Sequence, residues 1–287
     1  MKEVVVISGK GGTGKTTITA SLAALWKDKV IADCDVDAAD MHLLLDPTIQ
    51  QKSDFYSGVE AVIDGDRCTQ CGKCLAVCRF RAISPEFVVD SLACEGCGVC
   101  PYFCPMDAIS LVERHSGEWY VSDTRFGPMV HARLGIAEEN SGKLVSLIRK
   151  KAKELAEQRG LDLILSDGSP GIGCPVISSI TGASLVIVVT EPTVSGVHDM
   201  DRVLDLAKHF QIPAAMIINK YDLNEAMCQT SEARAQEYGT PVLGRIPYDP
   251  VVTRAMVQGK TVVEFQDGTV AKAIEEIGHK LWQRVKS

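Results

Sequence analysis

The stretch that decides the fold runs from Lys2 to Thr17 and reads KEVVVISGKGGTGKTT. Its first half, up to Ser8, is a largely apolar run of the kind found in parallel strands that are buried on both faces. Its second half matches G-x-x-x-x-G-K-[ST], the pattern of a phosphate-binding loop, and helix periodicity continues to Trp26. A strand before the loop and a helix after it are the context that this pattern requires. The stretch therefore predicts a nucleotide-binding α/β domain.

The loop itself carries groups that can hold phosphates. Its glycines allow backbone N–H groups to turn toward an anion, and the start of the following helix adds partial positive charge. We expect Lys15 to reach the β and γ phosphates of ATP and the hydroxyl of Thr16 to bind Mg²⁺. The predicted nucleotide-binding residues of the loop are Gly9, Lys10, Gly11, Gly12, Thr13, Gly14, Lys15, Thr16 and Thr17.

Beyond the loop, strand and helix patterns alternate along most of the chain. Further strands are predicted at 29–33, 161–166, 184–190, 213–219 and 241–246, with helices between them, such as 143–159 and 198–210. This alternation predicts one doubly wound, mostly parallel α/β sheet with helices on both faces. Cysteine, glycine and proline interrupt the pattern, so we assign 1–62 and 113–287 to the ATPase domain and 63–112 to an inserted module.

Composition limits the classes of function. Apolar residues make up 46% and charged residues 23% of the 287 residues, which is ordinary for a folded globular protein. The net charge of −7 argues against a nucleic-acid surface. The start is too short for a signal peptide, and no apolar stretch approaches the ~20 residues that span a bilayer. We expect a cytoplasmic protein, with membrane binding unlikely on these grounds.

Eight of the eleven cysteines lie between residues 68 and 104. They form the spacing C-x₂-C-x₂-C-x₃-C twice, and each cysteine recurs 26 positions later. The match continues from Arg79–Ile83 to Pro105–Ile109, so the module is an internal duplication. Such clustering in a long chain without an export signal indicates metal rather than disulfides. Paired C-x₂-C also suits tetrahedral zinc, which remains the alternative.

The duplicated spacing resembles the bacterial ferredoxins that carry two [4Fe–4S] clusters, in which the fourth cysteine of each run binds the other cluster. This resemblance implies Cys68, Cys71, Cys74 and Cys104 as ligands of the first cluster, and Cys78, Cys94, Cys97 and Cys100 as ligands of the second. Position 79 departs from the family pattern, which has proline there. Arg79 and Arg81 could raise one cluster's potential or could simply be solvated surface charges.

The loop also resembles the deviant phosphate-binding motif of the MinD, ParA, Mrp and nitrogenase-iron-protein ATPases, whose signature is the additional lysine at position 10. The resemblance implies a nucleotide-dependent homodimer in which Lys10 reaches the partner's phosphates. It also implies that Asp35 positions the attacking water and that Asp167, with Thr16, holds Mg²⁺. Lys10, Lys15, Asp35 and Asp167 are thus the expected catalytic residues.

The same resemblance implies contacts with the base from Asn219, Lys220, Pro247 and Asp249. The residues alone leave simpler alternatives open. Asp33 and Asp37 could be solvated turn residues at a strand end, and Asn219 could merely end its strand.

Two further features allow either a functional or a structural interpretation. Cys174 lies seven residues after Asp167, where the nitrogenase iron protein carries a ligand of its intersubunit cluster, but we favour a packed thiol. The stretch 270–285 is amphipathic, as in the membrane-binding end of MinD, although docking onto the sheet is the ordinary use of such a stripe.

Three functions follow from this combination. One is an ATPase that couples nucleotide to electron transfer or to redox-dependent partner switching. A second is an iron–sulfur carrier or assembly factor of the Mrp type, and the third is a MinD-like recruiting switch whose clusters are structural. Eight internal thiolates favour the first, with an unidentified redox or client protein as the partner.

Overall fold

The computed structural model describes residues 1–135 and 141–286, which form two compact units. The first unit comprises residues 1–53, residues 119–133 and the chain from Ser141 onward. The second comprises residues 54–118 and a short segment that begins at Leu134. The second unit contains the cysteine-rich range 63–112 and extends beyond it at both ends.

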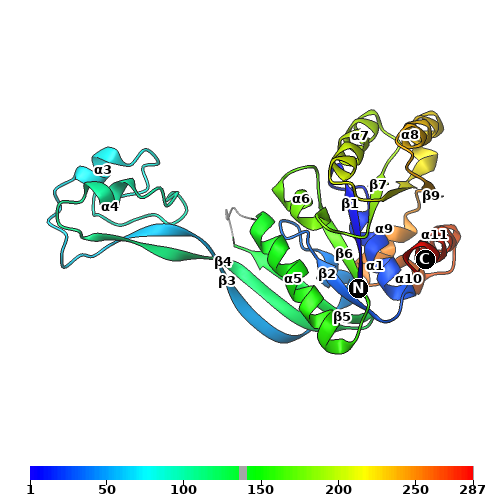
Figure 1. Cartoon of the computed structure of the whole chain (residues 1–287), viewed down its shortest axis with the longest axis horizontal. Coiled ribbons are helices and arrows are strands. Elements are labelled where there is room, and N and C mark those ends of the chain that lie inside the picture. Colours follow the sequence, from blue (N-terminus) through cyan, green and yellow to red (C-terminus); the bar gives the residue numbers. More distant parts are fainter. Residues whose placement is uncertain (136–140, 287) are drawn as a thin grey trace. The chain divides into compact units, whose positions relative to one another are not determined.

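Within the described residues, nine strands share one sheet in the order β3-β4-β5-β2-β6-β1-β7-β8-β9. The pairs β1–β6, β1–β7, β2–β5, β2–β6, β7–β8 and β8–β9 are parallel, so the predicted mostly parallel sheet is confirmed (Figure 1). The strands are β1 (Lys2–Ser8), β2 (Lys29–Asp33), β3 (Thr48–Ile63), β4 (Ile109–Thr124), β5 (Gly127–Leu134), β6 (Leu163–Pro170), β7 (Leu185–Thr190), β8 (Ala214–Asn219) and β9 (Val242–Ile246).

Helices connect most of these strands. In the first unit they are α1 (Lys15–Leu25), α2 (Met41–Leu45), α5 (Ser141–Arg159), α6 (Cys174–Ile180), α7 (Val194–His209), the 3₁₀ turn η1 (Tyr221–Leu223), α8 (Glu225–Glu237), α9 (Val251–Val257), α10 (Val262–Phe265) and α11 (Thr269–Lys286). In the second unit they are α3 (Lys73–Val77) and α4 (Val99–Phe103).

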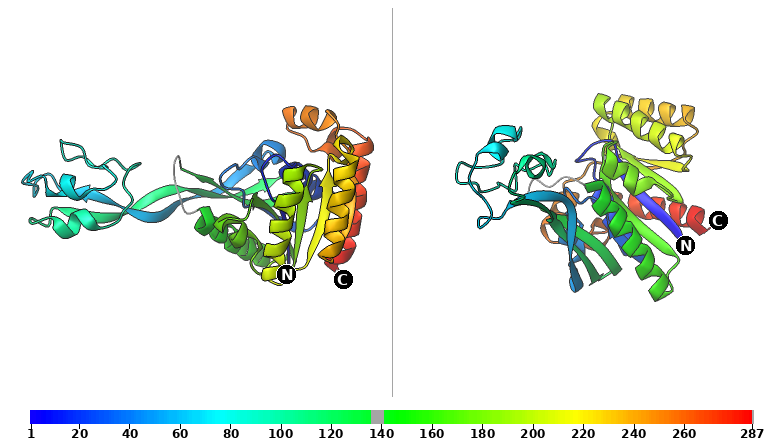
Figure 2. Two further views of the ribbon diagram at one scale, coloured as in Figure 1. Left: turned by 90° about the horizontal axis from the view of Figure 1, so that it is seen from above. Right: turned by 60° about the vertical axis from the view of Figure 1, so that its left-hand side comes forward.

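Strand β1 shows why its sequence is apolar almost throughout. Helices lie on both faces of the sheet (Figure 2). Val4 and Val6 belong to a core shared with α1 and α11, whereas Val5 and Ile7 belong to a second core shared with α6 and α7. All four are fully buried, and each such side chain contributes about 1.5–3 kcal/mol on burial. The strand is therefore central, and its carboxyl end leads directly into the phosphate loop.

The amphipathic C-terminal stretch is helix α11, and its apolar stripe is buried. Ile274, Ile277 and Leu281 join the core beneath α1, and the ring of Trp282 packs against that of Trp26 with centroids 5.6 Å apart. In the structure this stripe packs against the protein itself, as expected for docking onto the sheet.

Strands β3, β4 and β5 were not predicted from the sequence. Most of β3 is exposed, and its first half, Thr48 to Ser53, consists mainly of polar side chains. This first part of β3 has no buried face, so the alternation of apolar and polar residues on which strand prediction depends is missing there.

The second unit repeats its own backbone geometry after 26 residues. Helices α3 and α4 each follow a left-handed glycine, Gly72 at φ 75° and Gly98 at φ 76°. The N–H groups of Cys68 and Cys94 donate to the carbonyl oxygens of Asp64 and Asp90, each at 3.0 Å. The internal duplication in the sequence is therefore also a duplication of local structure.

Candidate functional site

The phosphate loop joins β1 to α1, with its backbone turned by glycines. Gly12 and Gly14 have φ values of +79° and +89°, which side chains rarely adopt. At Gly14 a Cβ atom would also lie 2.4 Å from Nδ2 of Asn219, which donates a hydrogen bond of 2.7 Å to the carbonyl oxygen of Thr13. Asn219 therefore supports the loop as well as lining the cavity beside it.

Lys15 is buried between two acids from different strands. Its Nζ lies 3.0 Å from Oδ2 of Asp35, which follows β2, and 3.0 Å from Oδ2 of Asp167 in β6. Burial alone would lower the pKa of Lys15, but the two carboxylates outweigh it and the pKa is raised. The lysine is a fixed cation at the carboxyl end of the sheet.

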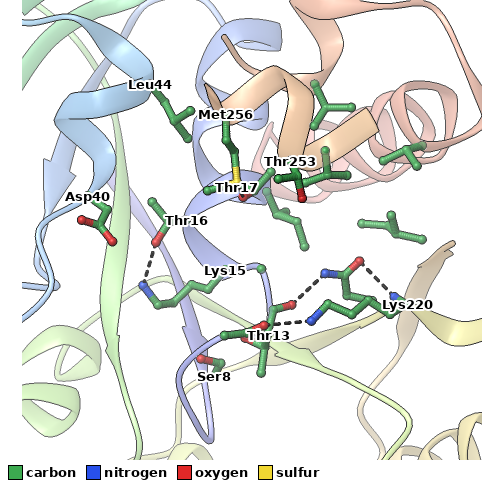
Figure 3. A pocket seen from close by; sticks show the side chains of 18 of the residues that line it. Ser8, Thr13, Lys15, Thr16, Thr17, Asp40, Leu44, Lys220, Thr253 and Met256 are labelled. Carbon is green, nitrogen blue, oxygen red and sulfur yellow. Dashed lines mark hydrogen bonds between the residues drawn. The ribbon is translucent and has the colours of Figure 1, made fainter. Parts of the chain in front are cut away.

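Asp167 is held by two hydroxyl groups of α1. Thr16 donates to its Oδ2 at 2.7 Å and Thr19 to its Oδ1 at 2.9 Å (the pocket is shown in Figure 3). The sequence analysis placed Thr16 beside Asp167 but missed Thr19. The signal was available, because Thr19 follows Lys15 by one helical turn and so lies on the same face of α1.

Asp33 is a further buried acid, 1% exposed, so the interpretation as a solvated turn residue is wrong for it. Its Oδ1 accepts the N–H of Asp35 at 3.2 Å. Burial, and then repulsion from Asp167, raise the pKa of Asp33 well above its usual range; burial also raises the pKa of Asp35. Asp37, by contrast, is exposed, as the turn interpretation predicts.

Several buried oxygen atoms at this site have no hydrogen-bond partner among the described residues. They are Oδ2 of Asp33, Oδ1 of Asp35 and Oγ1 of Thr13. Three buried carboxyl groups, those of Asp33, Asp35 and Asp167, face a single buried lysine. Buried charge is costly unless it is compensated, so this donor set fits a bound divalent cation.

Lys10 lies at the entrance of the loop and contacts the segment after β7. Its Nζ is 2.6 Å from Oε1 of Glu191, 3.0 Å from Oγ of Ser195 and 3.3 Å from Oγ1 of Thr193. Oε2 of Glu191 also lies 3.2 Å from Nζ of Lys220. Burial alone would raise the pKa of Glu191, but the two lysines hold it below its usual value.

Glu191 was missed by the sequence analysis. It directly follows strand β7, whose carboxyl end lies beside that of β1, so its position after a parallel strand was the available signal.

A cavity of about 480 Å³ opens beside the loop and α1. The predicted residues Thr17, Asn219, Lys220, Pro247 and Asp249 all line it, and its far wall is apolar (Figure 3). Its size is in the range of small-molecule and cofactor sites, about 300–1,000 Å³. Asp249 also has a structural role, because its Oδ1 accepts a hydrogen bond of 2.8 Å from the N–H of Val251, the first residue of α9.

In the second unit, the eight clustered cysteines converge in two groups of four. One small cavity is lined by Cys68, Cys71, Cys74 and Cys104, and another by Cys78, Cys94, Cys97 and Cys100. The fourth cysteine of each run thus lies with the first three of the other run. Apolar side chains close each cavity, including Phe87 and Ile109 in the first and Ala61 and Ile83 in the second.

Backbone N–H groups point at the sulfur atoms of these cysteines. Ala82 donates to Sγ of Cys78 and Ala108 to Sγ of Cys104, each at 3.3 Å. The N–H of Ala61 lies 3.5 Å from Sγ of Cys94. Such donors stabilise negative charge on sulfur, which suits thiolates that hold a metal cluster.

The remaining cysteines lie apart from these two groups. Cys34 and Cys228 are buried, and burial raises the pKa of both thiols. Cys174 is exposed at the start of α6, so it is not the packed thiol that we favoured. No helix among the described residues has the length and apolar character needed to cross a bilayer.

Comparison with known proteins finds relatives along almost the whole chain. The uncharacterized protein MJ0578 of Methanocaldococcus jannaschii is 33% identical over 283 residues, which cover 97% of this chain and 96% of the relative. An iron–sulfur cluster carrier protein of Pyrococcus horikoshii is 23% identical over 302 residues, covering 99% of this chain and 86% of the relative.

Solved structures share the fold. The cell division ATPase MinD of Pyrococcus furiosus superposes with a TM-score of 0.60 at 19% identity and covers 99% of both chains. The family model of the CobQ/CobB/MinD/ParA nucleotide binding domain matches residues 4–262. The chain therefore belongs to the CobQ/CobB/MinD/ParA family of nucleotide-binding proteins, whose MinD and ParA members are ATPases.

Proposed function

We propose that the protein binds and hydrolyses ATP, carries two [4Fe–4S] clusters, and couples the state of its nucleotide to electron transfer or to redox-dependent switching of a partner. The observation that carries this proposal is the presence in one chain of a phosphate loop with its acids and two cavities, each lined by four cysteines.

The nucleotide half of the proposal rests on the contacts of Lys15. In the structure Lys15 pairs with Asp35 and Asp167, and the phosphates of ATP would compete for the same ammonium group. Mg²⁺ would be held by Thr16 and Asp167 and would offset the excess of buried carboxylates. Asp35 would then be free of Lys15 and could orient the attacking water.

The proposed dimer rests on Lys10. Its side chain is 30% exposed, and its ammonium group is bound to Glu191 rather than to the loop's own phosphate cradle. A lysine at this position would bring a positive charge next to the phosphates bound by the partner subunit, as an arginine finger does in other P-loop enzymes. Association would require Lys10 to leave Glu191.

The cluster half of the proposal rests on the fit of the cysteine groups. Four thiolates per cavity, N–H donors to sulfur and apolar surroundings suit a [4Fe–4S] cluster, which would exchange single electrons. Two tetrahedral zinc ions are the alternative, but the run C-x₂-C-x₂-C-x₃-C, whose fourth cysteine lies with the other group, is the pattern of two-cluster ferredoxins. Residues Cys68, Cys71, Cys74 and Cys104 would hold one cluster and Cys78, Cys94, Cys97 and Cys100 the other.

The alternative of an iron–sulfur carrier is favoured by one observation, the similarity to Pyrococcus proteins named iron–sulfur cluster carriers. A carrier needs a labile cluster that it can give up. Cys174 is exposed but stands apart from the other cysteines, and the two groups of four would hold their clusters internally. The fold alone, shared with MinD, suits a recruiting switch equally.

The test is anaerobic purification followed by measurement of iron and of cluster potential. We expect about eight irons per chain and a potential that shifts when MgATP is added. Stoichiometric zinc without iron would overturn the proposal that the protein carries [4Fe–4S] clusters. Cluster potentials that do not change with MgATP would contradict the proposed coupling of nucleotide to redox state. Transfer of iron to an apo-protein would favour the alternative function of an iron–sulfur carrier.

A further inference from the structure

The duplication in the second unit allows two equivalent turns to be compared. One runs from Cys78 to Ala82 and the other from Cys104 to Ala108. In each, the third residue after the cysteine is left-handed, with φ of 54° at Arg81 and 47° at Asp107. In each, that residue's N–H donates to the cysteine carbonyl, at 3.3 Å and 3.4 Å respectively. The backbones are the same, so the side chains can be compared directly.

The side chains of the two turns differ in charge and shape. Arg79, Phe80 and Arg81 occupy one turn, where the other has Pro105, Met106 and Asp107. Aspartate is several-fold enriched in the left-handed conformation, whereas arginine has no such preference. An arginine kept in a sparsely populated backbone region points to a functional reason for it.

Neither arginine is used to stabilise the fold. Both side chains are exposed, and neither guanidinium group makes a hydrogen bond or an ion pair within residues 1–135 and 141–286. Two other arginines near the cysteines, Arg67 and Arg114, do form hydrogen bonds within the protein. Arg67 donates to the carbonyl oxygen of Met106 at 3.1 Å, and Arg114 donates to that of Cys94 at 3.4 Å.

The aromatic residue between the two arginines connects this surface to the second cysteine group. Phe80 is 45% exposed and also lines the cavity of Cys78, Cys94, Cys97 and Cys100. An exposed aromatic side chain flanked by unpaired cations is typical of the centre of a protein interface, where Phe and Arg are enriched.

We propose that Arg79, Phe80 and Arg81 form a docking surface for an acidic electron-transfer protein. The two cations would meet carboxylates of the partner and orient it, and Phe80 would be buried at the contact beside the second cluster site. A nucleic acid fits less well, because its binding depends on neutralising many phosphates and this surface offers only two cations. This inference rests on the proposed iron–sulfur function and names the partner of that site.

The test uses the anaerobically purified full-length protein and a plant-type [2Fe–2S] ferredoxin as a small acidic probe. Binding is measured by calorimetry at several salt concentrations for the wild type, the double variant Arg79→Glu/Arg81→Glu and the matched control Lys73→Glu. Lys73 lines the other cysteine cavity, so the control reverses one charge near the other cluster site. The variant Arg79→Lys/Arg81→Lys retains the charge.

We expect the glutamate double variant to bind at least tenfold more weakly and to lose its salt dependence. The lysine double variant and the Lys73 control should bind nearly as the wild type does. No binding by the wild type, equal binding by the glutamate variant, or an equal loss in the control would each overturn the proposal. Iron content, measured on every preparation, tests the proposed function separately from the docking surface.

Discussion

The contact between Lys10 and Glu191 leads to a specific prediction about dimer formation. In the structure the two charged groups are 2.6 Å apart, with side chains 30% and 16% exposed. Before Lys10 can reach a second subunit, this contact must break. The variant Glu191→Gln keeps the shape of the side chain and removes its charge, so it should make Lys10 easier to release.

The size of the effect follows from the contacts that remain. A hydrogen bond that involves charged groups contributes about 1.5–3 kcal/mol. The variant retains a neutral acceptor, and Lys10 keeps the hydroxyl groups of Ser195 and Thr193. We therefore expect a change of about 1.4 kcal/mol for each contact. A two-fold dimer releases two such contacts, so the total of about 2.8 kcal/mol corresponds to about a hundredfold tighter ATP-dependent dimer.

The assay is sedimentation of the MgATP-bound protein over a range of concentrations, together with ATPase activity per chain. Glu232→Gln is the matched control, because it removes the acid that pairs with Arg245 between α8 and β9. A second control places Glu191→Gln in a Lys10→Ala background, where it should have no effect on dimerisation. If Glu191→Gln changes dimerisation equally in the wild-type and Lys10→Ala backgrounds, the effect of Glu191 does not depend on Lys10, and the reasoning is refuted.

Three further predictions concern residues of the first unit. Lys15→Ala should abolish ATP binding, whereas Lys10→Ala should bind ATP and hydrolyse it poorly; equal loss of binding would show that both lysines act within one subunit. Gly14→Ala should prevent ATP binding, measured by calorimetry, because its Cβ would lie 2.4 Å from Nδ2 of Asn219; normal affinity would show that the loop can shift. Burial lowers the pKa of Lys29 from 10.5 to about 8, so the folded protein binds fewer protons than the unfolded chain between these values. The free energy of unfolding should therefore rise by about 3 kcal/mol from pH 8 to above pH 10.5, relative to Lys29→Met, in denaturant titrations; parallel pH profiles would contradict this.

The phosphate loop and the central strands could be predicted because their signals are local. Val4 to Ile7 is apolar on both faces of a strand, and the loop pattern follows at once. The two groups of cysteines could be predicted through the resemblance to ferredoxins, because spacing within each run is a sequence property.

Contacts made between distant segments could not be predicted in this way. Glu191 meets Lys10 only because β7 lies beside β1 in the sheet, and the sequence does not state strand order. Asp33 was open to interpretation as a solvated residue because its burial depends on Asp167 and Lys15, which are placed around it by other elements. Strand β3 was missed because an exposed strand has no periodic apolar face.

The packing of α5 and α6 bears on how nucleotide binding could reach the cysteine-rich unit. Asp167 lies in β6, and only residues 171–173 separate that strand from α6. Arg149 of α5 donates to the carbonyl oxygens of Ser178 and Thr181 at the end of α6, at 2.6 Å and 2.8 Å.

The first turn of α5 is also packed closely against α6. At Gly142 an added Cβ would lie 3.2 Å from Oγ of Ser178 and 3.4 Å from Cβ of Cys174. Helices packed this tightly move together rather than deform. A displacement of β6 on phosphate binding would therefore be passed through α6 to the start of α5, the point at which the chain returns from the second unit. Because linkage is reciprocal, a shift of the cluster potential on binding MgATP would be matched by a change in ATP affinity on reduction that is equal in free energy.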